Sequence, residues 1–203
     1  MTTLVIGRGE LKAASRFMAV GDIRYYLNGV LLESSSSTTR IAATNGHALF
    51  CGRYVGEGTN DNEFYGIVPD TAIKTITAWK GKKLEHVPVV FTFADDPCAN
   101  ENRAQWLDNV CIFRCIDGKF PDYARVIPPK GLIEEPSYYD AKYMMACSNA
   151  SQDLGGSEYY AFKQLGVGGS GVAVFTDDCF ALVMPVRERL ADMNNVEWAR
   201  TKI

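Results

Sequence analysis

Apolar and polar positions alternate in short runs along most of this chain, a pattern that predicts many short β-strands and few helices. The run Glu10–Val20 instead spaces its apolar residues three to four apart, which predicts an amphipathic helix. After it, the aromatic and branched run Ile23–Glu33 predicts one unbroken strand, with a bulge or a close backbone approach at Gly29. The segments on either side of Asn45 and Gly46 predict a hairpin. The first quarter of the chain is therefore expected to fold as a β-α-β-β-β unit.

The same order of elements returns twice, which indicates an internal repeat. A second unit is expected from Phe64 to Asp117, with a helix that starts at Pro69 and Asp70. A third unit has a predicted helix at Ala141–Ala150 followed by three strands. Because four strands, one helix and their turns need about 50–55 residues, the chain holds three such units and not four.

These units predict an α+β protein whose antiparallel sheets carry helices on one face. Residues 1–127 are expected to form a complete domain of two units, and residues 128–136 a linker with proline at both ends. Residues 137–187 would form a half domain of one unit, and residues 188–203 a tail helix. Such an odd number of units leaves a sheet edge that costs free energy if it stays exposed. Two copies of the half domain are therefore expected to complete each other about a two-fold axis.

Composition excludes several classes of protein. The chain is 47% hydrophobic and 11% aromatic, too apolar for a disordered segment. Its formal net charge of -3 argues against a protein that holds nucleic acid by bulk positive charge. No apolar run approaches the ~18–20 residues of a membrane helix, so we expect no membrane partner. Since Met1–Glu10 lacks the pattern of a signal peptide, we expect a cytoplasmic protein with reduced cysteines.

The polar residues predict no cofactor, no metal site and no catalytic residues. Cys111 and Cys115 have no nearby Cys-x-x-Cys partner, and His47 and His86 lie far apart in the chain. A phosphate-cradling glycine loop with lysine is absent from the sequence as well. We therefore expect a protein that is not an enzyme. An enzyme acting on nucleic acid is the alternative of a different class, and its signature would be metal-dependent nuclease activity that requires His47.

Four segments stand out together: Ile23–Glu33, Ile41–Leu49, Gly118–Pro128 and Leu182–Arg187. In this order they resemble one family, the bacterial sliding clamp, which is the β subunit of the replicative DNA polymerase. The resemblance is to a truncated clamp: it covers the complete middle domain and the last half of the third. Three positions depart from the family's usual residues, with Asn45 in place of aspartate and Ala48 and Ala124 in place of arginine.

The resemblance implies the DNA-clamp (processivity) fold and a role in DNA replication. In the family, rings of six such domains encircle duplex DNA, and a groove between the second and third domains captures short peptide motifs. The implied partners are a DNA polymerase or other proteins with clamp-binding motifs, duplex DNA held weakly and without sequence preference, and further copies of the chain in a homo-oligomer. A decoy or regulator that captures the same partners without encircling DNA is the alternative.

The resemblance also implies the binding residues. The peptide groove carries over to Leu27, Thr44, Gly46, His47, Leu49, Pro121, Arg125, Val126, Tyr143, Leu182, Val183, Met184, Pro185 and Val186. Its apolar members suit an aliphatic or aromatic anchor of a partner, and its polar members can fix the orientation of the peptide. The DNA side carries over to Arg24, Tyr25 and Tyr26, helped by a basic helix face with Lys12, Arg16, Lys74, Lys80, Lys82 and Lys83. Strand packing is the simpler interpretation of Tyr26.

Overall fold

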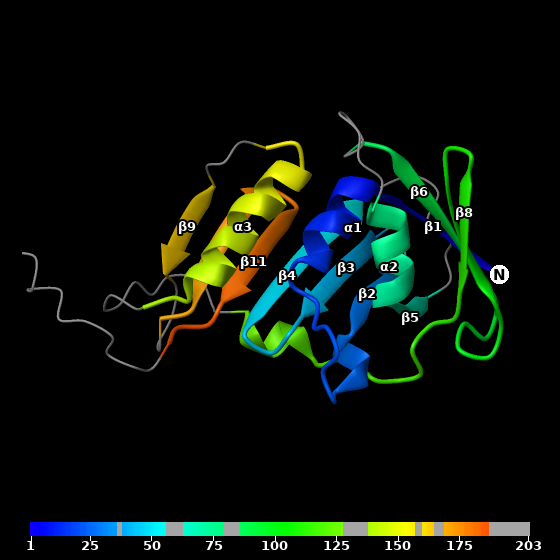
Figure 1. Cartoon of the computed structure of the whole chain (residues 1–203), viewed down its shortest axis with the longest axis horizontal. Helices are drawn as coiled ribbons and strands as arrows, with labels where there is room; N and C mark the ends of the chain where they lie inside the picture. Colours follow the sequence, from blue (N-terminus) through cyan, green and yellow to red (C-terminus); the bar gives the residue numbers. More distant parts are fainter. Residues whose placement is uncertain are drawn as a thin grey trace, which may run out of the picture.

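Three successive β-α-β-β-β units make up the molecule (Figure 1). A computed structural model of the chain describes residues 1–35, 38–55, 63–78, 86–127, 138–156, 160–164 and 169–186. In the third unit the place of the first strand is taken by Tyr138, which forms an isolated antiparallel bridge with Val186. The predicted linker and tail helix lie entirely outside the described residues.

Each unit contributes one helix and a set of short strands. The first consists of β1 (Thr2–Gly7), α1 (Arg8–Ser15), β2 (Gly29–Ser35), β3 (Thr38–Thr44) and β4 (Ala48–Val55). The second consists of β5 (Phe64–Pro69), α2 (Asp70–Thr77), β6 (Pro88–Phe93), β7 (Asn102–Trp106) and β8 (Asn109–Phe113). The third consists of α3 (Ala141–Asp153), β9 (Ala161–Gln164), β10 (Gly171–Thr176) and β11 (Cys179–Val183). Two short 3-10 helices add to these, η1 (Tyr25–Leu27) and η2 (Tyr123–Val126).

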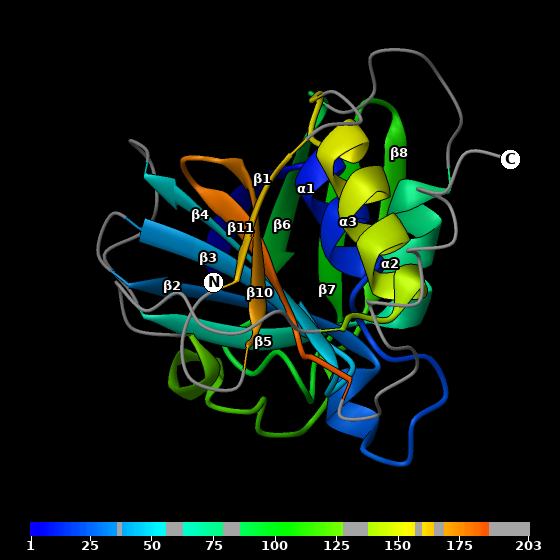
Figure 2. The same cartoon turned by 90° about the vertical axis from the view of Figure 1, so that its left-hand side faces the viewer.

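The strands form two antiparallel sheets, in the orders β1-β6-β7-β8 and β5-β2-β3-β4-β11-β10-β9. The first two units exchange their first strands, since β1 pairs with β6 and β5 pairs with β2. The third unit continues the sheet of the first, because β11 pairs with β4. All three helices lie side by side on one side of the seven-stranded sheet (Figure 2). The predicted α+β architecture of antiparallel sheets with helices on one face is confirmed.

Two apolar clusters form the core. The larger lies between the helices and the inward faces of both sheets and includes Phe17, Phe50, Phe91 and Phe93. The smaller lies on the opposite face of the seven-stranded sheet, where Phe120 packs in a cluster with strand residues of β2 to β5, β10 and β11. The candidate functional site lies on this second cluster.

Two predicted elements are wrong in their extent. The helix predicted at Glu10–Val20 starts at Arg8 and ends at Ser15, because the next backbone N–H groups bond three residues back, Phe17 N to Ala14 O at 3.0 Å. Phe17 is nevertheless buried, as its helical spacing predicted. The strand predicted at Ile23–Glu33 starts only at Gly29.

The side chain of Asn28 explains why the start of that predicted strand forms a loop instead. The side chain of Asn28 accepts a hydrogen bond from the backbone N of Asp22 at 2.9 Å and donates one to the backbone O of Asp22 at 2.8 Å. These two bonds close the loop that ends in η1. The close approach predicted at Gly29 is confirmed, because a Cβ there would lie 2.5 Å from the backbone O of Val68.

Candidate functional site

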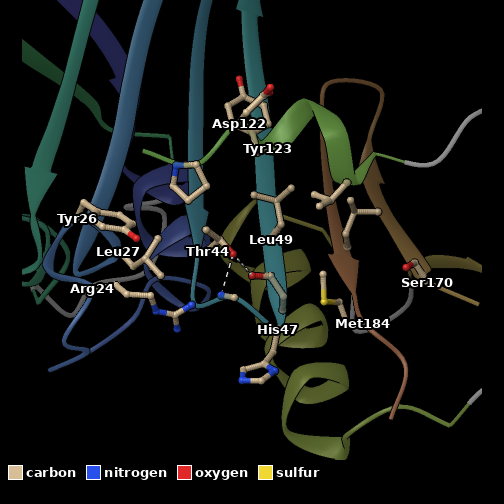
Figure 3. A pocket seen from close by; sticks show the side chains of 15 residues that line it. Arg24, Tyr26, Leu27, Thr44, His47, Leu49, Asp122, Tyr123, Ser170 and Met184 are labelled. Carbon is tan, nitrogen blue, oxygen red and sulfur yellow. Dashed lines mark hydrogen bonds between the residues drawn. The ribbon is translucent and has the colours of Figure 1, made fainter. Parts of the chain in front are cut away.

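A cavity of about 230 Å³ opens on the smaller apolar cluster, where the first and third units meet (Figure 3). One wall comes from η1, the end of β3 and the start of β4, with Leu27, Thr44 and Leu49. The opposite wall comes from the end of β11, with Leu182 and Met184. A third side comes from the segment that contains η2, with Pro121, Asp122, Tyr123 and Val126.

The hairpin turn between β3 and β4 holds one wall in place. The side-chain Oδ1 of Asn45 accepts hydrogen bonds from the backbone N of His47 at 3.0 Å and of Ala48 at 3.1 Å, as in an Asx turn. Gly46 has a φ of 90°, a conformation that favours glycine. The Thr44 hydroxyl donates to the backbone O of Ala48 at 2.8 Å. The hairpin predicted at Asn45 and Gly46 is thereby confirmed.

The pairing of β4 with β11 fixes the distance between the two walls. Leu49 lies opposite Leu182, and both side chains face the cavity. Next to this pair, Val183 lies opposite Ala48. Beyond it, the backbone N of Met184 donates to the backbone O of His47 at 3.0 Å. Because side chains alternate along a strand, Val183 points to the helices and is buried in the larger core cluster.

The cavity has an apolar floor and a partly polar rim. Leu27, Leu49 and Leu182 form the buried base of the two walls, which is the floor of the cavity, whereas Met184 is 45% exposed at the rim. Arg24 lies at the rim, where its guanidinium pairs with Asp22 at 2.7 Å and donates to the backbone O of Asn45 at 3.3 Å. The hydrogen bond from Arg24 lowers the pKa of the Asp22 carboxyl to about 2.

Tyrosine hydroxyls fix the η2 segment across the sheet. The hydroxyl of Tyr123 donates to the Glu33 carboxylate at 2.5 Å, and burial raises the pKa of that hydroxyl well above its ordinary value. The hydroxyl of Tyr65 accepts from the backbone N of Phe120 at 2.5 Å. Together with the buried ring of Phe120, these contacts set the position of the third side of the cavity.

The structure brings together most of the predicted groove residues. Nine of them line the cavity: Leu27, Thr44, Gly46, His47, Leu49, Pro121, Val126, Leu182 and Met184. Among the described residues, the lining does not include Arg125, Tyr143, Val183, Pro185 or Val186. Tyr143 extends the site beyond the cavity, because its ring stacks on His47 with centroids 6.2 Å apart. Arg125 pairs with Asp122 at 2.9 Å, and the backbone N of Val186 donates to Tyr138 O at 2.7 Å.

Sequence reasoning missed four lining residues: Ala48, Asp122, Tyr123 and Ser170. Asp122 and Tyr123 stand inside the segment Gly118–Pro128, so their proximity to predicted residues was the available signal. Ser170 precedes β10 in a glycine-rich stretch that carries no such signal.

The residues predicted to face DNA separate in the structure. Arg24 and Tyr26 line the cavity, whereas Tyr25 lies outside the lining and is exposed, with its ring edge-on to Tyr26 at 5.7 Å. Three cations of the predicted basic face lie among the described residues, and each has a carboxylate partner. Lys12 Nζ lies 2.5 Å from the Asp153 carboxylate, and Arg16 donates to the same carboxylate. Lys74 pairs with Asp70 at 2.5 Å; Lys80, Lys82 and Lys83 lie outside the described residues.

Comparison with known proteins identifies the family and the fold to which this chain belongs. Residues 11–122 match the family model described as the DNA polymerase III beta subunit, central domain, and this match covers more than half of the chain. The chain therefore belongs to the DNA polymerase III beta subunit family.

Two curated relatives are beta sliding clamps. That of Pseudomonas aeruginosa is 33% identical over 114 residues, which is 56% of this chain and 29% of the relative. That of Escherichia coli K12 is 31% identical over 124 residues, covering 58% of this chain and 30% of the relative. The match spans less than a third of the length of these relatives.

Solved structures extend the likeness to the third unit. A DNA polymerase III subunit beta from Pseudomonas aeruginosa superposes with a TM-score of 0.69 at 22% identity, over 92% of this chain and 66% of that one. A sliding clamp of the same organism with a ligand gives 0.66 at the same identity and coverage. The sliding-clamp fold is thus present over nearly the whole chain. No helix among the described residues is long and apolar enough to cross a membrane.

The Asn45 side chain gives a first prediction for this site. Asn45→Ala is expected to destabilise the protein by about 1 kcal/mol, because the turn loses the acceptor of two backbone N–H groups. Asn45→Asp keeps an oxygen at the same place and should retain most of the stability. Urea denaturation of the two variants beside the parent measures the difference. Equal stability of Asn45→Ala and the parent would contradict this role of the turn.

Proposed function

We propose that this chain is a non-enzymatic, sliding-clamp-like protein of DNA replication that captures short clamp-binding motifs of polymerases or repair proteins. The cavity between the first and third units is the observation that carries the proposal. Its leucine floor can bury an aliphatic or aromatic anchor, and its rim offers the Arg24 guanidinium, the Thr44 hydroxyl and exposed backbone at the turn. Such a protein would act in the cytoplasm, together with its replication partners.

The size of the cavity favours a peptide side chain as the ligand. At about 230 Å³ it is smaller than the ~300–1,000 Å³ of most small-molecule sites. One or two anchor side chains would fill it, while the rest of the peptide lies over the rim. Met184 is suited to this position because its flexible thioether can repack around anchors of different shape.

A direct titration tests this proposal. A fluorescent peptide carrying the clamp-binding motif of a bacterial DNA polymerase is expected to show saturable binding in anisotropy, and an excess of the unlabelled peptide should reverse it. A scrambled peptide of the same composition is the control. Equal binding of the two peptides, or none by either, would contradict the proposed groove.

A second candidate function is a decoy that captures these partners without holding DNA. The pairing of Lys12 and Arg16 with Asp153, and of Lys74 with Asp70, favours it. Cations that already have carboxylate partners contribute less to phosphate binding, and release of counterions from phosphates supplies most non-specific affinity for DNA. The first candidate extends to an oligomer that encircles DNA only if the helix face also carries unpaired cations.

Duplex DNA separates the two candidates. The decoy predicts that a labelled duplex is not saturated at protein concentrations below about 100 µM in ~150 mM salt. A dissociation constant of about 100 µM is the weak end of the usual range for non-specific DNA binding. The peptide should saturate under the same conditions. Saturable duplex binding near 1 µM, with a steep dependence on salt, would favour the clamp that holds DNA.

A further inference from the structure

The last strand of the second unit, β8, has a free edge. In the first and third units the last strands pair with each other, since β4 and β11 run antiparallel with Phe50 opposite Ala181. β8 is the equivalent strand of the second unit, and it is the terminal strand of the four-stranded sheet. It lies toward the end of the molecule opposite β9 (Figure 1). The last strands of the first and third units thus pair with each other, whereas the last strand of the second unit has no partner at its outer edge among the described residues.

The sequence of β8 does nothing to protect this edge. Asn109–Phe113 contains no proline and no charged residue, the features with which edge strands usually avoid pairing. On its outward face Val110 is 45% exposed and Ile112 is 62% exposed. The pairing register places Val110 beside the exposed side chain of Gln105, followed in the same row by Val90 and Val5.

The geometry of the β7–β8 hairpin determines which backbone groups face outward. The two strands are joined by the two-residue turn Leu107 and Asp108, and Leu107 has a φ of 48°. In such hairpins the residues of the closing pair, here Trp106 and Asn109, exchange two backbone hydrogen bonds. Non-hydrogen-bonded and hydrogen-bonded pairs then alternate along the two strands. The N–H and C=O groups of Val110 and Ile112 therefore point away from β7, toward the free edge.

We propose that β8 pairs antiparallel with β8 of a second copy of this chain, about a two-fold axis at Cys111. Val110 then lies opposite Ile112 of the partner subunit, so each outward-pointing N–H meets a C=O and these two exposed apolar side chains cover each other. A two-fold axis is the symmetry with which one strand edge can satisfy an identical edge. This inference extends the self-association that the odd number of units predicts, and it is independent of the peptide groove.

The symmetric pairing brings two cysteines together. Cys111 is a free, half-buried thiol at the centre of β8. At the axis it occupies a non-hydrogen-bonded position, where opposite Cα atoms lie about 4.5 Å apart, within the range that a disulfide spans. Cys111 of one copy should therefore react with Cys111 of the partner subunit when a mild oxidant removes two electrons and two protons.

Solution mass of charged variants tests the contact. Val110→Lys places an ammonium group at the edge and is expected to halve the mass measured by light scattering at ~50 µM. Val5→Lys puts the same charge on the same sheet face but away from β8, and should leave the mass unchanged. The wild-type mass of a single chain, or a mass that Val110→Lys leaves unchanged, would overturn the proposal. Circular dichroism confirms that both variants fold.

Cross-linking gives an independent readout. In a Cys98→Ser background, which removes the exposed thiol, oxidation with copper phenanthroline should give a reducible dimer that Cys111→Ser abolishes. A dimer that persists in Cys111→Ser, or no dimer in either variant, would overturn the proposed axis. Peptide binding measured on Val110→Lys should stay within twofold of the parent. Loss of the β8 contact and failure of the groove are thus distinguished.

Discussion

Met184→Ala is expected to weaken binding of a clamp-binding peptide by about tenfold or more. Met184 directly follows the last residue of β11, and its thioether forms the exposed edge of one cavity wall. Truncating a side chain that a ligand covers completely costs roughly 1–2 kcal/mol, and 1.4 kcal/mol corresponds to a factor of ten. Since Met184 is nearly half exposed in the free protein, the loss should fall on binding rather than on folding. Isothermal calorimetry with the same peptide measures it.

A second methionine gives a matched control. Met145 is 67% exposed on α3, outside the cavity lining. Met145→Ala removes the same atoms and should leave the dissociation constant within a factor of two. Equal weakening of peptide binding by both variants would mean that the peptide does not contact the Met184 side chain. Urea denaturation of both variants checks that neither loses more than about 1 kcal/mol of stability.

Asp153→Asn is expected to destabilise the protein by about 2 kcal/mol. Asp153 ends α3 with its side chain 4% exposed, and its carboxylate holds Lys12 and Arg16 of the first unit. Breaking a buried ion pair from one side costs up to ~3–5 kcal/mol, and the partial exposure of the two cations reduces that figure here. Without the carboxylate, Lys12 and Arg16 are left facing each other with like charge. Urea denaturation measures the loss.

Asp178→Asn is the control for this effect. Asp178 also joins the third unit to the first, through Arg53 at 2.7 Å, but both side chains are more than half exposed. Exposed pairs of this kind contribute ~0–1 kcal/mol, so a small change is expected. If Asp153→Asn and Asp178→Asn cost the same, the buried carboxylate does not hold α1 against α3. Because that contact joins the two units that form the cavity walls, Asp153→Asn should also weaken peptide binding.

The repeat could be predicted from the sequence because periodicity and turn residues agree along much of the chain. The hairpin at Asn45 and Gly46 could be predicted because the hydrogen bonds and the backbone conformation that form its turn lie within four residues of the chain. The start of β2 could not be predicted in the same way. Ile23–Leu27 has the aromatic and branched composition of a strand, but the Asn28 side chain bonds the backbone of Asp22 and curls the segment into η1.

The candidate site could be predicted as a set of segments but not side chain by side chain. Leu182 and Val183 are adjacent and similarly apolar, yet the register of β11 on β4 directs Leu182 to the cavity and Val183 to the core. Register depends on pairing between residues more than 120 positions apart in the chain, which local patterns do not encode. The resemblance predicts DNA contact for Arg24 and Tyr26, and the structure shows in addition that both line the cavity.

The most direct test of the proposed groove observes the methionine methyl groups by NMR. The chain has six methionines, so labelling their methyl groups with ¹³C gives a small set of signals. The signal that is lost in Met184→Ala is assigned to Met184. Addition of the clamp-binding peptide is expected to shift the Met184 signal in a saturable way and to leave the Met145 signal in place. Saturable binding of the peptide with no change at Met184 would contradict the proposal that this cavity is the binding site.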